Sequence, residues 1–108
     1  MIVHYWLPPF APMAAITIFR RVFAKRGINP LDLEHEAVHV AQQERDRWRF
    51  LLRYVFVPSW RVRYEAEAYA VQARAGCPID ELAGFLSGPL YLWPCSREVA
   101  AAAIREAM

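Results

Sequence analysis

The sequence predicts a mainly helical α+β fold with a small N-terminal β element, in one domain that spans residues 1–108. Three observations predict it. A chain of 108 residues has room for one hydrophobic core. Hydrophobic residues make up 56% and aromatic residues 14%, which excludes intrinsic disorder and indicates a sizeable core. Helix-capping signals recur after residue 28, whereas β-branched and aromatic residues gather before Gly27.

Short strands are expected within the strand-rich segment 1–27. Residues 2–6 are apolar and aromatic, and residues 15–19 alternate isoleucine with threonine and phenylalanine, which is the period of a strand. A second short strand of about 21–25 is expected to follow. Gly27 then closes the segment.

The apolar N-terminus does not read as a signal peptide or a membrane span. It lacks the positively charged n-region of a signal peptide, and the prolines at 8, 9 and 12 interrupt any helix there. Arg20 and Arg21 end the run short of the roughly 20 residues that a span needs. The two cysteines, Cys77 and Cys95, do not make a disulfide framework. We therefore expect a cytoplasmic protein with reduced thiols and no membrane partner.

Two longer helices are expected after Gly27. Asn29 followed by Pro30 is a strong helix start, and this helix should cover about 30–52. Pro58 ends what precedes it, and Ser59 can cap a second helix of about 60–75, with Gly76 as its stop.

C-terminal helices are expected within 79–107. A short helix should cover about 79–86, and Ser96 can cap a last helix over 97–107. Gly88-Pro89 and Trp93-Pro94 mark the loop between them.

The first long helix carries the motif His35-Glu36-Ala37-Val38-His39. Histidines four residues apart lie about 40° apart around a helix, so both imidazoles can reach one metal ion. Glu36 lies about 100° from His35, where it can reach a water at that metal as a general base. The competing interpretation is a pair of solvent-facing histidines on an amphipathic helix.

A zinc site needs a third protein ligand, and the second long helix offers two glutamates. Glu65 and Glu67 point about 200° apart, so only one can face inward. Glu67 shares its face with Arg63 and Arg74, whereas the neighbours of Glu65 are much less charged. We therefore favour Glu65, with Glu67 as the alternative.

The distance between the two helices constrains their connection. A helix that ends near Leu52 has risen about 20 Å past His39, and Glu65 recovers only about 7.5 Å of that along its own helix. The remaining ~12 Å fits an extended connection. The sequence thus predicts that Arg53–Pro58 is a returning, largely non-helical connection. The helix that carries Glu65 should then run roughly antiparallel to the active-site helix, the one that carries His35 and His39.

These motifs resemble the zincin metallopeptidases of the gluzincin type, in which HExxH and a downstream glutamate hold zinc. Residues 35–43, HEAVHVAQQ, are similar to the HExxHxxQQ of small uncharacterised peptidases, and residues 65–68 are similar to their E-x-x-A segment. The resemblance covers about 30–75. It implies a minimal zincin-like core and hydrolysis of a peptide or protein substrate. It also implies one zinc ion held by His35, His39 and Glu65, with Glu36 as general base and acid.

The chain departs from this pattern after the E-x-x-A segment. Many of these peptidases carry an aspartate there, which orients a ligand histidine, whereas this chain has Tyr69. We expect the Tyr69 hydroxyl to take that role, or catalysis to be tuned more weakly. Gln42 and Asp46 follow the histidines at one-turn intervals, and either can hold an imidazole N–H or line the cleft edge.

Several other side chains have both a structural and a functional interpretation. Tyr54 and Tyr64 are expected in the core rather than in catalysis. His4 can stabilise an oxyanion only if the first strand packs near the metal. Cys77 or Cys95 as a fourth zinc ligand would make a latent enzyme.

Two alternatives to a peptidase remain open. One is a non-catalytic, zinc-stabilised module that binds protein partners. The other is nucleic-acid binding through Arg45–Arg63, which holds six arginines and one acid, although a net charge of +2 does not favour it. The chain is too short for a second substrate lobe, so an extended peptide would pair with an edge strand, for which residues 15–19 are the candidate. The sequence makes no prediction of oligomeric state.

Overall fold

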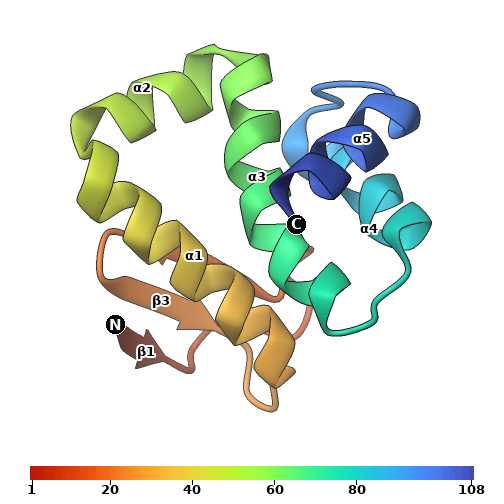
Figure 1. Ribbon diagram of the computed structural model, residues 1–108. Coiled ribbons are helices and arrows are strands. Elements are labelled where there is room, and N and C mark those ends of the chain that lie inside the picture. The colour runs from red at the N-terminus through yellow and green to blue at the C-terminus, as the bar shows by residue number, and fades with distance from the viewer.

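The computed structural model describes residues 1–108 and is a mainly helical α+β fold, as predicted. Figure 1 shows the small sheet under α1, with α3, α4 and α5 on the other side of α1. In chain order the elements are β1 (Ile2–His4), β2 (Ala15–Ile18), β3 (Arg21–Ala24), α1 (Pro30–Asp46), α2 (Trp48–Phe56), α3 (Pro58–Arg74), α4 (Ile79–Leu86), the 3₁₀ turn η1 (Pro89–Tyr91) and α5 (Arg97–Ala107).

The three strands form one sheet in the order β1-β3-β2. β3 is the central strand, parallel to β1 and antiparallel to β2, so β2 lies at an edge. Each strand is shorter than expected by one or two residues. β2 ends at Ile18 because the backbone turns at Phe19, which has a φ of 54°. The buried side chains of Val22 and Ala24 pack with Val40 of α1, which fixes the sheet against that helix.

The start of α1 agrees with the sequence, but its end does not. Asn29 caps the helix by accepting a hydrogen bond from the Leu31 N–H at 2.8 Å. The expected helix over 30–52 is wrong, because α1 stops at Asp46. At Arg47 the chain turns with a φ of 52° and a ψ of −124°, outside helical geometry.

The expected non-helical connection over Arg53–Pro58 is also wrong. Residues 48–56 form α2, and only Val57 separates it from α3. Figure 1 shows α2 lying across the gap between the far end of α1 and the start of α3. The break at Arg47 is the physical reason: once α1 ends early, a transverse helix covers the distance that an extended connection was expected to cover.

α3 returns antiparallel to α1. Pro58 takes the first helical position, so the helix begins two residues before the expected start and Ser59 is not its cap. Contacts pair the start of α1 with the end of α3, through Asp32 and Gln72, and the end of α1 with the start of α3, through Asp46 and Tyr64. This order of contacts agrees with the predicted antiparallel arrangement.

The C-terminal helices build a second core on α3. α4 and α5 have the expected bounds, and Ser96 caps α5 by accepting from the Val99 N–H at 3.2 Å. Leu86 and Ile104 are completely buried in this core. The α1–α3 interface therefore has the sheet core on one side and the C-terminal core on the other. None of the helices is long and apolar enough to cross a bilayer.

Candidate metal centre

Three ligand-type atoms meet at the buried interface of α1 and α3. The Glu65 Oε1 atom lies 3.1 Å from His35 Nε2 and 3.0 Å from His39 Nε2, and the two Nε2 atoms are 3.2 Å apart. The two histidines lie one turn apart on α1, whereas Glu65 comes from the second turn of α3. All three side chains are buried. The antiparallel packing of two helices thus brings together residues 26 and 30 positions apart.

The ring orientation of His39 is set by Gln42. The Gln42 Nε2 group donates to the backbone carbonyl of Tyr64 at 2.8 Å and to Glu67 at 3.1 Å, both of which can only accept. The Gln42 Oε1 atom therefore faces His39 Nδ1, 2.9 Å away, and accepts its proton. This places the hydrogen of a neutral His39 on Nδ1 and leaves the Nε2 lone pair directed at Glu65.

His35 is held in the same way by Gln72 of α3. The Gln72 Nε2 group donates to Asp32 Oδ1 at 2.9 Å, so its Oε1 accepts from His35 Nδ1 at 3.0 Å. An edge-on contact with the ring of Tyr69, 4.4 Å between ring centroids, fixes the other side of the imidazole. His35 therefore also presents the Nε2 lone pair to the common point.

The His35, His39 and Glu65 group can hold a metal ion. Its ligand atoms lie within 4.8 Å of one another. With both Nδ1 atoms protonated, neutral imidazoles and a carboxylate present three lone-pair atoms to one point, an arrangement that needs a proton or a cation between them. Two imidazole nitrogens and one carboxylate oxygen match the donors of known metal sites.

The electrostatics of the group favour a positive charge at this point. Burial alone lowers the pKa of His39, but the Glu65 carboxylate outweighs it and raises that pKa to about 9. Burial likewise raises the pKa of Glu65, and the adjacent His39 more than compensates, so this pKa is well below its ordinary value. The carboxylate thus remains ionised and demands a cationic partner.

Glu36 lies on the same turn of α1 and faces the same cavity. Its Oε2 atom accepts a hydrogen bond from the Thr17 hydroxyl of β2 at 2.5 Å, while no protein donor bonds its Oε1 atom. Burial raises the pKa of Glu36 even though His39 and Thr17 oppose the rise. Glu36 therefore combines a fixed orientation with one free oxygen and a proton affinity above that of an exposed glutamate.

A cavity of about 250 Å³ opens over these side chains. His35, Glu36, His39 and Glu65 lie on its wall. Apart from these four, the lining is apolar, aromatic or uncharged: Met13, Ala15, Ile16, Thr17, Gln43, Phe50, Leu51, Tyr54, Val55, Leu90 and Tyr91. A ligand of the His35, His39 and Glu65 group would therefore enter between β2, α2 and η1.

Two tyrosines of this cavity contact the site in ways the sequence did not predict. The Tyr54 hydroxyl donates a hydrogen bond to Glu65 Oε2, so its role is more than core packing. Tyr91 of η1, which carried no sequence signal, is hydrogen-bonded at 2.8 Å to the Tyr69 hydroxyl. The expected Tyr69 hydroxyl contact with a ligand histidine is absent, because that hydroxyl is used by Tyr91 and the histidine by Gln72.

The remaining candidate residues lie outside the group. Glu67 is half-exposed and bonds Gln42, so the structure brings Glu65 rather than Glu67 to the histidines. Asp46 accepts from the Tyr64 hydroxyl at 2.7 Å and contacts arginines, away from the cavity wall.

His4 and the two cysteines also lie away from the candidate metal ligands. His4 stacks on Phe23 and bonds Arg21. Cys77 and Cys95 form no disulfide and pack against the C-terminal core, so neither supplies a fourth ligand here.

Gln72, Tyr54 and Thr17 are the contacts that the sequence did not reveal. Gln72 lies two turns after Glu65 on α3, and this helical spacing places the two side chains on one face. Tyr54 lay in the segment that was expected to be non-helical, which left its direction undefined. Thr17 reaches Glu36 through the packing of β2 on α1, which no local pattern encodes.

No protein-family model matches this chain, and neither does any curated protein or any solved structure.

Proposed function

We propose that this protein is a minimal zinc-dependent metallopeptidase of the gluzincin type. The observation that carries the proposal is the convergence of His35, His39 and Glu65 on one buried point, with Glu36 on the wall of the same cavity. Both histidines have their Nδ1 atoms held by glutamine oxygens, which is the outer contact that metal-ligating histidines generally make.

Zinc is the metal that this donor set fits best. Two histidines and one glutamate are a common catalytic set for zinc and leave a further coordination position free for water or substrate. When bound there, zinc would act as a Lewis acid on a substrate carbonyl and lower the pKa of a water molecule. Tyr54 would orient the ligand carboxylate through its hydrogen bond to Glu65 Oε2.

In this proposal Glu36 moves the protons of the reaction. Its free Oε1 atom accepts a proton from the attacking water, and Glu36 then delivers that proton to the leaving nitrogen of the cleaved peptide bond. The hydrogen bond from Thr17 keeps the carboxyl in place during both transfers. Burial raises the pKa of Glu36, which favours its uptake of a proton from the water.

An extended peptide is the substrate form that the surroundings of the site accommodate. β2 lies at the edge of the sheet, and its residues Ile16 and Thr17 lie on the cavity wall. Because the Gln43 amide bonds the Thr17 carbonyl and the Phe19 N–H on the outer edge of β2, a substrate strand that pairs along this edge would displace the Gln43 side chain. A peptide paired to β2 would pass Glu36 and the ligand group. We further propose a cytoplasmic site of action, since two cysteines without a disulfide suit a reducing compartment.

The proposal is tested with Glu36→Gln in the zinc-loaded protein. Because Glu36 is not a ligand, the variant should retain its zinc and lose hydrolysis of a casein or random-peptide substrate by about 10²-fold or more. Glu34→Gln, on the exposed face of the same helix, is the matched control and should hydrolyse at the wild-type rate. Wild-type activity in Glu36→Gln would overturn the mechanism. A zinc-loaded wild-type protein that hydrolyses neither substrate would instead favour the alternative, a non-catalytic zinc-stabilised module.

A further inference from the structure

An apolar stripe of α2 faces solvent. Trp48, Leu52, Val55 and Phe56 recur at the helical spacing of one face, and all four are more than half exposed. The opposite face is the buried one, where Phe50 packs against Tyr64. α2 therefore has two apolar faces. One is buried against the protein at Phe50, and the other is exposed to solvent.

A second exposed apolar segment adjoins this stripe. After η1, Leu92 and Trp93 both adopt left-handed backbone geometry, with φ of 62° and 47°, and each side chain is 69% exposed. Two backbone hydrogen bonds hold this turn, from Leu92 N–H to Pro89 and from Trp93 N–H to Gly88. Val55 and Leu92 line one shallow groove of about 170 Å³, so the two segments form one surface.

A buried arginine joins α2 to this turn. Arg61 donates to the backbone carbonyls of Tyr54 at 2.7 Å and Val55 at 2.8 Å, and to that of Tyr91 at 3.1 Å. These bonds satisfy carbonyls at the end of α2 that have no intrahelical partner. Hydrogen bonds thus hold the backbone on which the exposed apolar side chains lie. We define the exposed apolar face as Trp48, Leu52, Val55, Phe56, Leu92 and Trp93.

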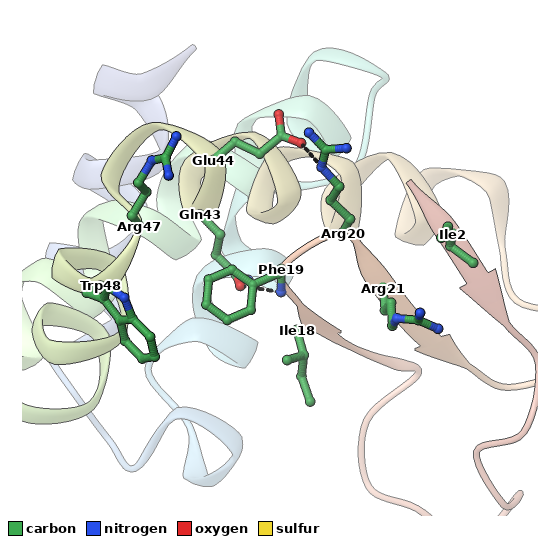
Figure 2. A pocket seen from close by; sticks show the side chains of 9 residues that line it. All are labelled: Ile2, Ile18, Phe19, Arg20, Arg21, Gln43, Glu44, Arg47 and Trp48. Atoms are coloured by element: carbon green, nitrogen blue, oxygen red, sulfur yellow. Dashed lines mark hydrogen bonds and ion pairs between the residues drawn. The ribbon is translucent and has the colours of Figure 1, made fainter.

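The surface also extends towards the sheet. The ring of Phe19 meets that of Trp48 edge-on, with centroids 6.1 Å apart. Figure 2 shows Phe19, Ile18 and Trp48 along one side of an open hollow of about 980 Å³, with Arg20 and Arg47 along its other side. This hollow therefore has an apolar side and a charged side, and on the charged side Arg20 pairs with Glu44 at 3.0 Å.

Arginines outnumber acidic residues around the exposed apolar face, where Glu44 and Asp46 pair with Arg20 and Arg45. Residues 47–63 hold five arginines and no aspartate or glutamate. Arg47 and Arg49 are exposed and form no ion pair, and Arg49 lies on the flank of the apolar stripe. An occupant of this face must therefore be apolar at its centre and anionic at its rim.

Although the sequence predicts no membrane partner, we propose that the exposed apolar face docks on an anionic phospholipid bilayer. The exposed aromatic and aliphatic side chains would enter the boundary between headgroups and acyl chains, while Arg47 and Arg49 contact the phosphates. A second copy of this chain fits less well, because pairing α2 with α2 joins two arginine-rich segments that lack acids. A nucleic acid offers no apolar partner to Leu52 or Val55.

Docking would turn the candidate site towards the lipid surface. Val55 belongs both to the exposed apolar face and to the wall of the metal-binding cavity, and Leu90 likewise lines the cavity and the adjoining groove. The opening of the cavity is therefore beside the docking surface. This placement concerns the surface alone and stands whether or not the site hydrolyses peptides.

Vesicle sedimentation tests the proposal with the full chain. We expect wild type to co-sediment with vesicles of equal parts phosphatidylcholine and phosphatidylglycerol, and to be released by high salt or by omission of phosphatidylglycerol. The fluorescence of Trp48 and Trp93 should shift to the blue on binding. Failure to sediment with the anionic vesicles would overturn the proposal.

Paired variants locate the surface. Leu52→Ser with Phe56→Ser should weaken vesicle binding more than ten-fold. Phe10→Ser with Val99→Ser, at residues elsewhere that are also more than half exposed, should leave it unchanged. Arg49→Gln should weaken it about five-fold and Arg105→Gln little. Equal effects of test and control variants would overturn the proposal, as would a dimer that the Leu52 and Phe56 changes dissociate without any vesicle binding.

Discussion

At the scale of single residues, the glutamines behind the two histidines are the least conspicuous part of the candidate site. Gln42 and Gln72 each accept an imidazole Nδ1–H, and each amide is oriented by a second partner that can only accept. Gln42→Ala or Gln72→Ala should therefore lower zinc affinity by about 10–100-fold while the three ligands remain. Competition with a zinc-binding dye measures the affinity.

Gln43 is the matched control for this prediction. It is buried beside Gln42 on α1, but its side chain bonds the backbone of Thr17 and Phe19 rather than a histidine. Gln43→Ala should lower stability without changing zinc affinity. A loss of affinity in Gln43→Ala as large as in the other two variants would show that general loosening, rather than histidine orientation, is responsible.

Site residues that share a helix could be predicted together, whereas those contributed by other elements could not. His35, Glu36 and His39 could be placed together because they share one helix and its fixed period. Glu65 could be preferred to Glu67 because charged neighbours mark a solvated face. Tyr54 and Thr17 come from other elements, and their distance to the site depends on packing that no local pattern contains.

At the scale of elements, the break between α1 and α2 is the feature that the sequence did not predict. Arg47 occupies a backbone conformation that favours glycine, with a φ of 52°. A glycine there would have signalled the break, but an arginine carries no such signal, so the helix was expected to continue to Leu52. The burial of Phe50 beside Tyr54 and Tyr64 is the tertiary contact that accompanies the strained turn.

This strain predicts a stabilising substitution. Arg47→Gly should raise the free energy of unfolding by about 1 kcal/mol, because it removes the cost of the positive φ. Leu52→Gly, at an exposed interior position of α2, should instead lower it by about 1 kcal/mol. Urea unfolding followed by circular dichroism measures both, and a destabilised Arg47→Gly would contradict this account of the turn.

At the scale of the whole molecule, two small cores flank the candidate metal-binding group. One joins the sheet to α1 through Val22 and Val40, and the other joins α3 to α4 and α5 through Leu86 and Ile104. The helical class and the antiparallel α1–α3 pair could be predicted from caps and from the reach between His39 and Glu65. The transverse placement of α2 could not, since it depends on both cores at once.

We propose that the α1–α3 interface holds one zinc ion. The most direct test is the zinc content of the chelator-treated, zinc-reloaded and desalted protein, measured by mass spectrometry of the metal beside His39→Ala. We predict about one zinc per chain in wild type and far less in His39→Ala. Wild type without bound zinc, or equal zinc in both proteins, would contradict the account.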